Sequence, residues 1–137
     1  MPHPEGIVPS TASIASTGLG IRYIGKHIWA ASGAIQDAAS GAASTEMLNF
    51  TSGTGYIMGK LDFTNTLSTN SGDKVFLDLT FNGLTVLAFE QDDAPNEISS
   101  PFYILIPPRT HFILKWGVSN VTKDAYAFLT GRVYGEE

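Results

Sequence analysis

Residues 74–89 read KVFLDLTFNGLTVLAF, and their pattern indicates the fold class. From Lys74 to Phe81 apolar side chains alternate with largely polar ones, which is the period of a β-strand with one buried face. Asn82-Gly83 follows at once, and an apolar run resumes from Leu84 to Phe89. Asn-Gly favours a two-residue type I′ turn, because both turn positions need a positive φ. The stretch therefore predicts a β-hairpin.

From residue 45 onward the chain consists of similar short runs separated by turn residues. Strands are predicted at Tyr56–Thr66, Phe102–Ile106, Thr110–Val118 and Ala125–Tyr134, with less regular candidates at Ile21–Trp29 and Thr45–Phe50. Antiparallel strands without crossover helices need a second layer over their apolar faces. We therefore expect an all-β fold, an antiparallel two-sheet β-sandwich of jelly-roll type with about eight strands. A small closed barrel is the alternative.

Two stretches depart from this pattern. Residues 1–20 are rich in Pro, Ser, Thr and Gly, and their isolated apolar residues cannot bury enough surface to offset the lost chain entropy. We expect an extended N-terminal arm over residues 1–20 and a single β-sandwich domain over residues 21–137. The Ala/Ser/Gly-rich stretch 30–44, AASGAIQDAASGAAS, has no apolar stripe, so it is interpreted as a loop with one helical turn.

The composition argues against several classes of function. The 137 residues suit one domain and carry a net charge of -5, so the chain offers no basic field for nucleic acid. The absence of cysteine removes disulfides, thiolate zinc sites and cysteine nucleophiles. No apolar run approaches the ~18 residues of a membrane helix, and residues 1–5 lack the basic start of a signal peptide. We expect neither nucleic acid nor a membrane as a partner.

Catalytic patterns are incomplete throughout the chain. The string Gly53–Lys60 resembles a phosphate-binding loop but lacks its first glycine, its final hydroxyl residue and a following helix. It is interpreted as a loop that enters a strand. His3, His27 and His111 form no close metal-binding pattern and are interpreted as surface or rim histidines, although a cupin-like metalloenzyme would require such residues to converge. We expect no enzymatic activity.

An acidic turn offers a candidate ion site. Residues 90–97 read EQDDAPNE, in which Glu90, Asp92, Asp93 and Glu97 supply the hard oxygen ligands that Ca²⁺ prefers. The spacing lacks the glycine and terminal glutamate of an EF-hand loop, and a solvated acidic turn accounts for the same residues. No other cofactor is expected, and calcium is the first metal to test.

The two tryptophans are candidates for sugar contact, because aromatic rings stack on the apolar faces of sugars. The alternation of its strand places Trp116 in the core. Trp29 lies at the edge of the small-residue stretch and is the candidate glycan contact.

Low charge and mixed strand faces indicate a surface kept for partners. Only 15% of the residues are charged, fewer than a solitary soluble protein of this size usually carries. Phe76 lies on the otherwise polar face of its strand, and Phe128, Arg132 and Tyr134 share one face of the last strand. Aromatic residues beside an arginine are typical of interface centres, so these four are candidate oligomer-interface residues. The alternative is that a second sheet covers them within one subunit.

The C-terminal part of the chain contains several turn and strand motifs in a defined order. Asn82-Gly83, a variable acidic loop, Ile104–Thr110 (ILIPPRT) and Leu129–Gly135 (LTGRVYG) together resemble small β-sandwich virion proteins of bacteriophages, in particular capsid decoration and other head-surface proteins. The resemblance covers residues 56–135. It implies a structural role as a small homo-oligomeric module, often a trimer, seated on a protein shell.

The leading hypothesis is a non-enzymatic structural protein of a virion, a homo-oligomeric decoration or head-surface protein. Its expected partners are its own copies, with a trimer favoured, and a viral capsid or another virion protein. Residues 1–20 would contact the shell or a neighbouring copy. The alternative is a carbohydrate-binding or receptor-binding β-sandwich module that uses Trp29.

Overall fold

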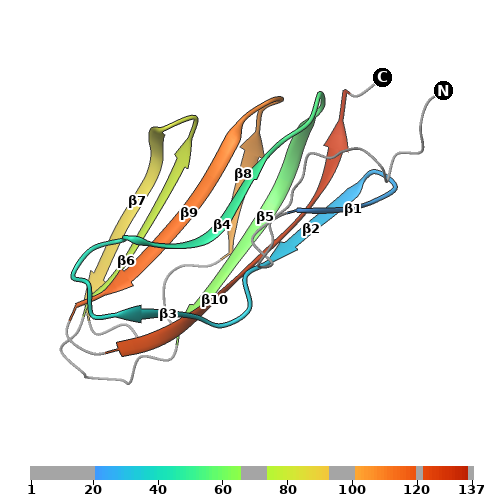
Figure 1. Cartoon of the computed structure of the whole chain (residues 1–137). Helices are drawn as coiled ribbons and strands as arrows, with labels where there is room; N and C mark the ends of the chain where they lie inside the picture. The colour runs from blue at the N-terminus through green and yellow to red at the C-terminus, as the bar shows by residue number, and fades with distance from the viewer. Residues whose placement is uncertain (1–20, 66–73, 93–100, 120–121, 136–137) are drawn as a thin grey trace.

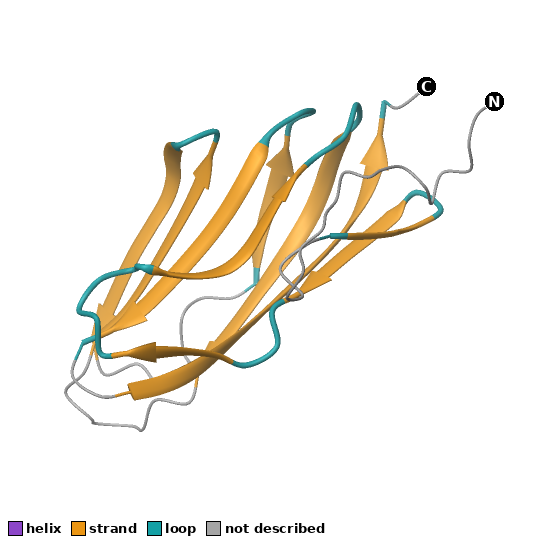
Figure 2. Ribbon diagram, viewed as in Figure 1, coloured by secondary structure: helices purple, strands orange, loops and turns teal. Residues whose placement is uncertain are grey.

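The computed structural model describes residues 21–65, 74–92, 101–119 and 122–135, which form ten β-strands in two antiparallel sheets (Figure 1). Figure 2 shows only strands and loops in this part of the chain. The six-stranded sheet contains β1 (Arg22–Ile24), β2 (His27–Ala31), β3 (Ile35–Ala38), β5 (Tyr56–Asn65), β8 (Phe102–Ile106) and β10 (Thr122–Tyr134). The four-stranded sheet contains β4 (Thr45–Thr51), β6 (Lys74–Phe81), β7 (Leu84–Asp92) and β9 (His111–Val118). The predicted all-β, two-sheet fold is confirmed.

The strand order is that of a jelly roll. The six-stranded sheet runs β1-β2-β10-β5-β8, and β3 follows β2 along the same side of β10. Between them the Ser32 N–H donates to the Ala127 carbonyl, and the Ser32 Oγ accepts from the Ala127 N–H, at 3.0 and 2.9 Å. If β2 and β3 are counted as one interrupted strand, eight strands form two facing sheets, β2/β3-β10-β5-β8 and β4-β9-β6-β7. Strand β1 is an addition to this plan.

The local predictions around two glycine-containing turns are confirmed. Strands β6 and β7 form the expected hairpin, because Phe81 pairs with Leu84, and Asn82 and Gly83 have φ values of 52° and 84°. Strand β5 begins at Tyr56, so Gly53–Gly55 is a loop that enters a strand. The last residue of the predicted strand Tyr56–Thr66 lies outside the described residues.

The prediction of a single strand at Ile21–Trp29 is wrong. The stretch forms a second hairpin, in which Ile24 of β1 pairs with His27 of β2. Gly25 has a φ of 61°, a value that glycine adopts at little cost, and this residue turns the chain after only three residues of β1.

The helical turn predicted within residues 30–44 is also wrong. Ile35–Ala38 form β3, whose hydrogen-bonding partner is β10, nearly ninety positions away in the sequence. After β3 the small residues 39–44, here called the crossing segment, cross the four-stranded sheet. The Gly41 N–H donates to the Val118 carbonyl at 3.1 Å. A Cβ atom at Gly117 would overlap the Ala42 carbonyl oxygen, so the crossing requires a bare backbone at this point. The unusual composition of the stretch thus serves close backbone packing.

Buried Asp37 fastens this crossing segment. Its carboxylate accepts hydrogen bonds from the Thr45 hydroxyl at 2.6 Å, the Ser40 N–H at 3.0 Å and the Val118 N–H at 3.0 Å. These donors belong to β4, to the crossing segment and to β9, whereas Asp37 belongs to β3. One carboxylate therefore joins an edge of the six-stranded sheet to the four-stranded sheet.

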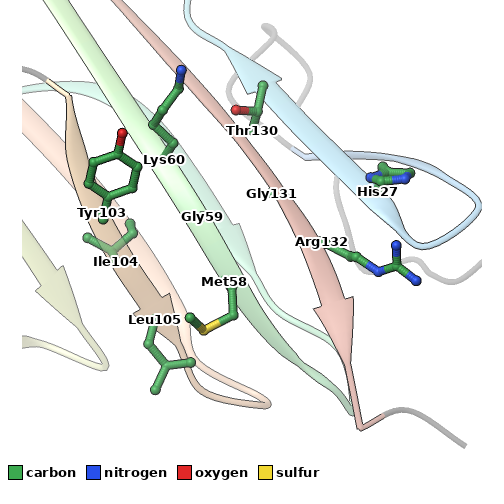
Figure 3. Close-up of a pocket in the computed structure, with 10 residues that line it drawn as sticks. All are labelled: His27, Met58, Gly59, Lys60, Tyr103, Ile104, Leu105, Thr130, Gly131 and Arg132. Carbon is green, nitrogen blue, oxygen red and sulfur yellow. The ribbon is translucent and has the colours of Figure 1, made fainter.

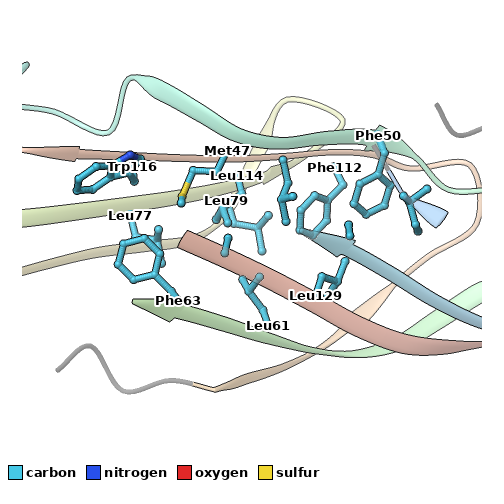
Figure 4. Packing of buried hydrophobic residues seen from close by; sticks show 14 of the residues in the cluster. Met47, Phe50, Leu61, Phe63, Leu77, Leu79, Phe112, Leu114, Trp116 and Leu129 are labelled. Carbon is cyan, nitrogen blue, oxygen red and sulfur yellow. The ribbon is translucent and has the colours of Figure 1, made fainter. Parts of the chain in front are cut away.

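The hydrophobic core fills the space between the two sheets (Figure 4). Trp116 is fully buried there, as predicted, and its indole Nε1–H donates to the Ile35 carbonyl at 3.2 Å. The rings of Phe50 and Phe112 stack with centroids 4.5 Å apart. This packing buries the inner faces of both sheets, so any partner must contact an outer face or an edge.

The predicted arm, residues 1–20, lies outside the described part of the chain. No helix of the kind that could cross a membrane occurs in the ranges that the structure describes. The structure does not test whether residues 21–137 form a single domain with the arm separate from it, so that division stays a prediction.

Candidate functional site

The outer face of the six-stranded sheet is covered with exposed apolar side chains. Eleven large hydrophobic side chains are exposed in the described residues, and nine of them lie on this sheet, the other two being on β7. We call the nine the aromatic face: Ile24, Trp29, Tyr56, Met58, Tyr103, Leu105, Tyr126, Phe128 and Tyr134. The alternation of β10 explains the arrangement, because Ala127 and Leu129 point into the core and their neighbours point outward.

Strand pairing places these residues in rows across the sheet. Paired residues of an antiparallel ladder point to the same side, so each row can be read from the register. One row contains Arg22, Trp29, Thr130, Lys60 and Tyr103. The next contains Ile24, His27, Arg132, Met58 and Leu105. Each row therefore carries at least one positively charged side chain and ends on β8 with a large exposed side chain, Tyr103 or Leu105.

A depression of about 680 Å³ lies across these rows (Figure 3). Its lining comes from β2, β5, β8 and β10: His27, Met58, Gly59, Lys60, Tyr103, Ile104, Leu105, Thr130, Gly131 and Arg132. Gly59 pairs with Gly131, and a Cβ atom at Gly131 would lie 2.6 Å from the Met58 carbonyl oxygen. A residue larger than glycine therefore does not fit where β5 and β10 meet beneath the depression.

The depression is basic as well as apolar. Lys60 and Arg132 contribute two positive charges to its lining, His27 adds an imidazole ring, and no acidic residue lines it. The Arg132 guanidinium carbon lies 5.7 Å from the centroid of the Tyr134 ring, a cation–π contact that orients the arginine on the surface. In a chain of net charge -5 this is a local reversal of sign. The site suits a partner with an apolar surface and some negative charge.

The four predicted interface residues fall on two opposite faces. Phe128, Arg132 and Tyr134 lie together on the outer side of β10. Phe128 and Tyr134 are 45% and 41% exposed, so the second sheet does not cover them within the subunit. Phe76 lies on the outer side of β6 in the other sheet, half-buried beside the crossing segment at residues 41–43. The structure therefore groups three of the four residues.

Trp29 is 38% exposed and belongs to the aromatic face, where it pairs with Thr130 of β10. Met58, Tyr103 and Leu105 were not predicted as site residues. The sequence does contain a pattern that could have indicated Tyr103 and Leu105 as exposed apolar residues. All five residues of Phe102–Ile106 are apolar, although the strand is short and bounded by prolines. The signal for Met58 was weaker, because only its register against β8 places it beside them.

The predicted calcium loop is only partly described. Glu90 lies within 3.1 Å of the Lys74 Nζ, as an ion pair on the four-stranded sheet. The side chain of Asp92, and Asp93 and Glu97 altogether, lie outside the described residues. Calcium binding therefore stays a prediction.

The described histidines do not converge. His27 lies on the outer face of the six-stranded sheet, and His111 lies on the outer face of the other sheet, where its Nε2 is 2.7 Å from the Asn49 Oδ1. His3 lies outside the described residues. Within the described ranges, no three His, Asp or Glu side chains form a group that could hold a metal ion.

A solved viral structure contains a chain that is similar to this one. No family model matches the chain, and no curated protein matches it. Among solved structures, a chain from the structure of infectious bursal disease virus Gx strain is similar, with 15% sequence identity and a TM-score of 0.48. The match covers 94% of this chain and 38% of that chain. Likeness of this degree does not assign a function.

Proposed function

We propose that this protein is a non-enzymatic structural component of a virion, located on a viral shell and binding the shell through the aromatic face. The observation that carries the proposal is the concentration of nine exposed large hydrophobic residues on one side of the molecule. Monomeric soluble proteins rarely expose apolar patches larger than a few hundred Å² unless the patch binds something. Jelly rolls recur in viral capsid domains, which is compatible with this role but does not establish it.

The composition of the face supports protein contact. Tyrosine, tryptophan, methionine and arginine are enriched at the centres of interfaces, and Tyr134, Trp29, Met58 and Arg132 all lie here. The polar outer face of the other sheet would then face solvent. We further propose that the protein associates with copies of itself, and that residues 1–20 add to the contacts with the shell or a neighbouring copy.

The location is tested on virus particles purified from the source of the sequence. We expect the chain to co-sediment with intact particles and to be labelled on their surface by immunogold electron microscopy. Its recovery only in the soluble fraction, with no label on particles, would contradict the proposal.

The contact face is tested by rebinding. Particles depleted of the chain are mixed with wild-type protein, with Phe128→Ser or with Phe76→Ser, a matched phenylalanine on the opposite outer face. We expect wild type and Phe76→Ser to rebind, and Phe128→Ser to rebind at least about tenfold more weakly. Equal binding of the two variants would exclude the aromatic face as the contact.

A carbohydrate-binding or receptor-binding module is a second candidate, because jelly rolls also occur in lectins. The specific observation in its favour is that Trp29 and Tyr103 are exposed in one row with Lys60 and Thr130, which offer hydrogen-bond donors beside aromatic rings. A glycan array separates the two proposals. Binding that is lost in Trp29→Ala and retained in Phe128→Ser would favour the module, and no binding by the intact protein would exclude the glycans tested.

A further inference from the structure

Strand β8 is an edge strand with unusual composition. It ends the order of the six-stranded sheet, and within the described residues it pairs with β5 on one side only. Its sequence, Phe102–Ile106, is FYILI, with Pro101 before it and Pro107-Pro108 after it. Tyr103 is 78% exposed, which is the highest value among the exposed large hydrophobic residues.

The other sheet edges carry charged residues and β8 does not. Arg22 lies in β1, Glu46 in β4 and Glu90 in β7, each on a strand at the margin of its sheet. The remaining edge strand, β3, contains Asp37, whose buried carboxylate binds β4 and β9. Proteins commonly place charges on edge strands because a free apolar edge recruits another strand. The absence of charge in β8 therefore marks the edge at which strand addition is permitted.

The surroundings of β8 are also apolar on both sides. The basic depression on the outer face includes Tyr103, Ile104 and Leu105. A second depression, of about 600 Å³, lies between β8 and β7 and includes the same three residues. A strand added beside β8 would bring its own side chains against both hollows.

We propose that β8 of one copy pairs antiparallel with β8 of a second copy, around a two-fold axis at Ile104. This inference rests on the proposed self-association. In this register Tyr103 pairs with Leu105 of the partner subunit, and Phe102 with Ile106 of the partner subunit. Because β8 is uncharged, pairing with its own copy brings no like charges together. A second copy is therefore the occupant that this edge fits.

The arrangement has a consequence for the shell contact. Paired residues of an antiparallel ladder point to the same side of the sheet, so the two aromatic faces lie on one side of the dimer. The two copies then present one continuous surface. The contact is isologous, so it predicts a dimer or an even-numbered assembly in place of the trimer implied by the sequence resemblance.

Single cysteines test the register, since the chain has none of its own. Tyr103→Cys and Leu105→Cys are co-expressed, the mixture is oxidised mildly, and covalent dimers are measured on non-reducing gels. Paired residues have Cα atoms about 4.5–5.5 Å apart, which a disulfide can span. We expect cross-linked dimers from the mixture and few from either variant alone, because identical positions are two residues out of register.

The matched control is a co-expressed pair on the same face but two strands away, Tyr126→Cys with Phe128→Cys, which should not cross-link. Native mass spectrometry of the full chain should give an even-numbered oligomer for wild type and Phe128→Lys, and monomer for Leu105→Lys. Circular dichroism checks that each variant folds. A monomeric or trimeric wild type, or equal cross-linking in the control, would overturn β8 pairing.

These outcomes separate the two proposals. A β8-linked dimer that is absent from virus particles would leave this contact standing and refute the virion role. A trimer found on particles would support the virion role and refute β8 pairing.

Discussion

The two outer faces of the sandwich differ more than the alternation of their strands predicts. On the four-stranded sheet the polar groups satisfy one another: Asn49 Nδ2 donates to Glu46 Oε1 at 3.1 Å, and Asn49 Oδ1 is 2.7 Å from the His111 imidazole. Lys74 and Glu90 form an ion pair on the same face. The aromatic face instead presents large apolar side chains and the basic groups of the depression, which have no ion-pair partner among the described residues.

The difference separates what folding requires from what binding requires. Both sheets bury the same kind of inward residue, such as Leu79 and Leu129, because a sandwich needs an apolar interior. The outward residues do not pack in the core, so their composition can match either the solvent or a binding partner. A polar outward face suits water, and an apolar one suits a partner. The comparison therefore predicts that substitutions on the two faces have different consequences.

The largest effect is expected where the crossing segment closes over the four-stranded sheet. Gly117→Ala places a methyl group against the Ala42 carbonyl oxygen, so the segment must move away from β9. We expect a loss of about 3 kcal/mol in the free energy of unfolding, measured with urea. Gly53→Ala is the control, because a Cβ atom there meets nothing closer than 3.8 Å, and it should cost less than about 1 kcal/mol. Equal effects would mean that the segment is not held at Gly117.

The next effect concerns the carboxylate that joins the sheets. Asp37→Asn replaces an acceptor of several hydrogen bonds with a group that also donates, so we expect a loss of about 2 kcal/mol at neutral pH. Asp78→Asn, on the outer face of the four-stranded sheet, is the control and should stay within about 0.5 kcal/mol of wild type.

The same carboxylate predicts how stability depends on pH. Burial alone would raise the pKa of Asp37, but hydrogen bonds from Thr45, Ser40 and Val118 outweigh it and lower the pKa below its ordinary value of 3.8. The unfolded chain therefore binds the proton first, so this contribution is present above pH 3.8 and is lost as the pH falls through the folded pKa. As the pH falls below 4, the free energy of unfolding of wild type should decrease more steeply than that of Asp37→Asn. Parallel curves would contradict the role of Asp37.

A direct comparison of the faces comes from the unfolding of the two phenylalanine variants used for rebinding. Phe128→Ser changes an exposed residue and should alter the free energy of unfolding by less than about 0.5 kcal/mol. Phe76→Ser changes a half-buried residue beside the crossing segment and should cost about 1 kcal/mol. Phe76→Ser should thus lose more stability, and Phe128→Ser should lose more binding to particles. A stability loss in Phe128→Ser as large as its binding loss would mean that Phe128 serves folding as much as binding.

Local signals made much of the fold predictable. Asn82-Gly83 specifies its hairpin within four residues, and the alternation around Trp116 places that ring in the core. The missed strand β3 depends on β10, which lies far away in the sequence, so no local window could reveal it. Its four residues, IQDA, show no apolar alternation, and the alanines, serines and glycines on either side favour other structures in isolation. Tertiary pairing overrides that preference.

The site was less predictable for a related reason. Alternation tells which side of a strand a residue occupies, but not which sheet contains the strand. Phe76 and Phe128 both face outward as predicted, yet from opposite sheets. Tyr103, Leu105 and Met58 join the aromatic face only through the pairing of β5 with β8. The sequence identified the outward residues, and topology decided which of them share a surface.

The smallest effect is expected on the polar face itself. Glu90→Gln breaks the ion pair with Lys74, but both side chains are about half exposed, at 53% and 46%, so water already screens their attraction. We expect a change of at most about 0.5 kcal/mol in urea unfolding, with no change in oligomer mass or in rebinding to particles. Leu105→Lys, which adds a charge on β8, is the opposite case and should dissociate the oligomer. If Glu90→Gln also dissociated it, the four-stranded sheet would be part of an interface, and the contrast between the two faces would not reflect binding.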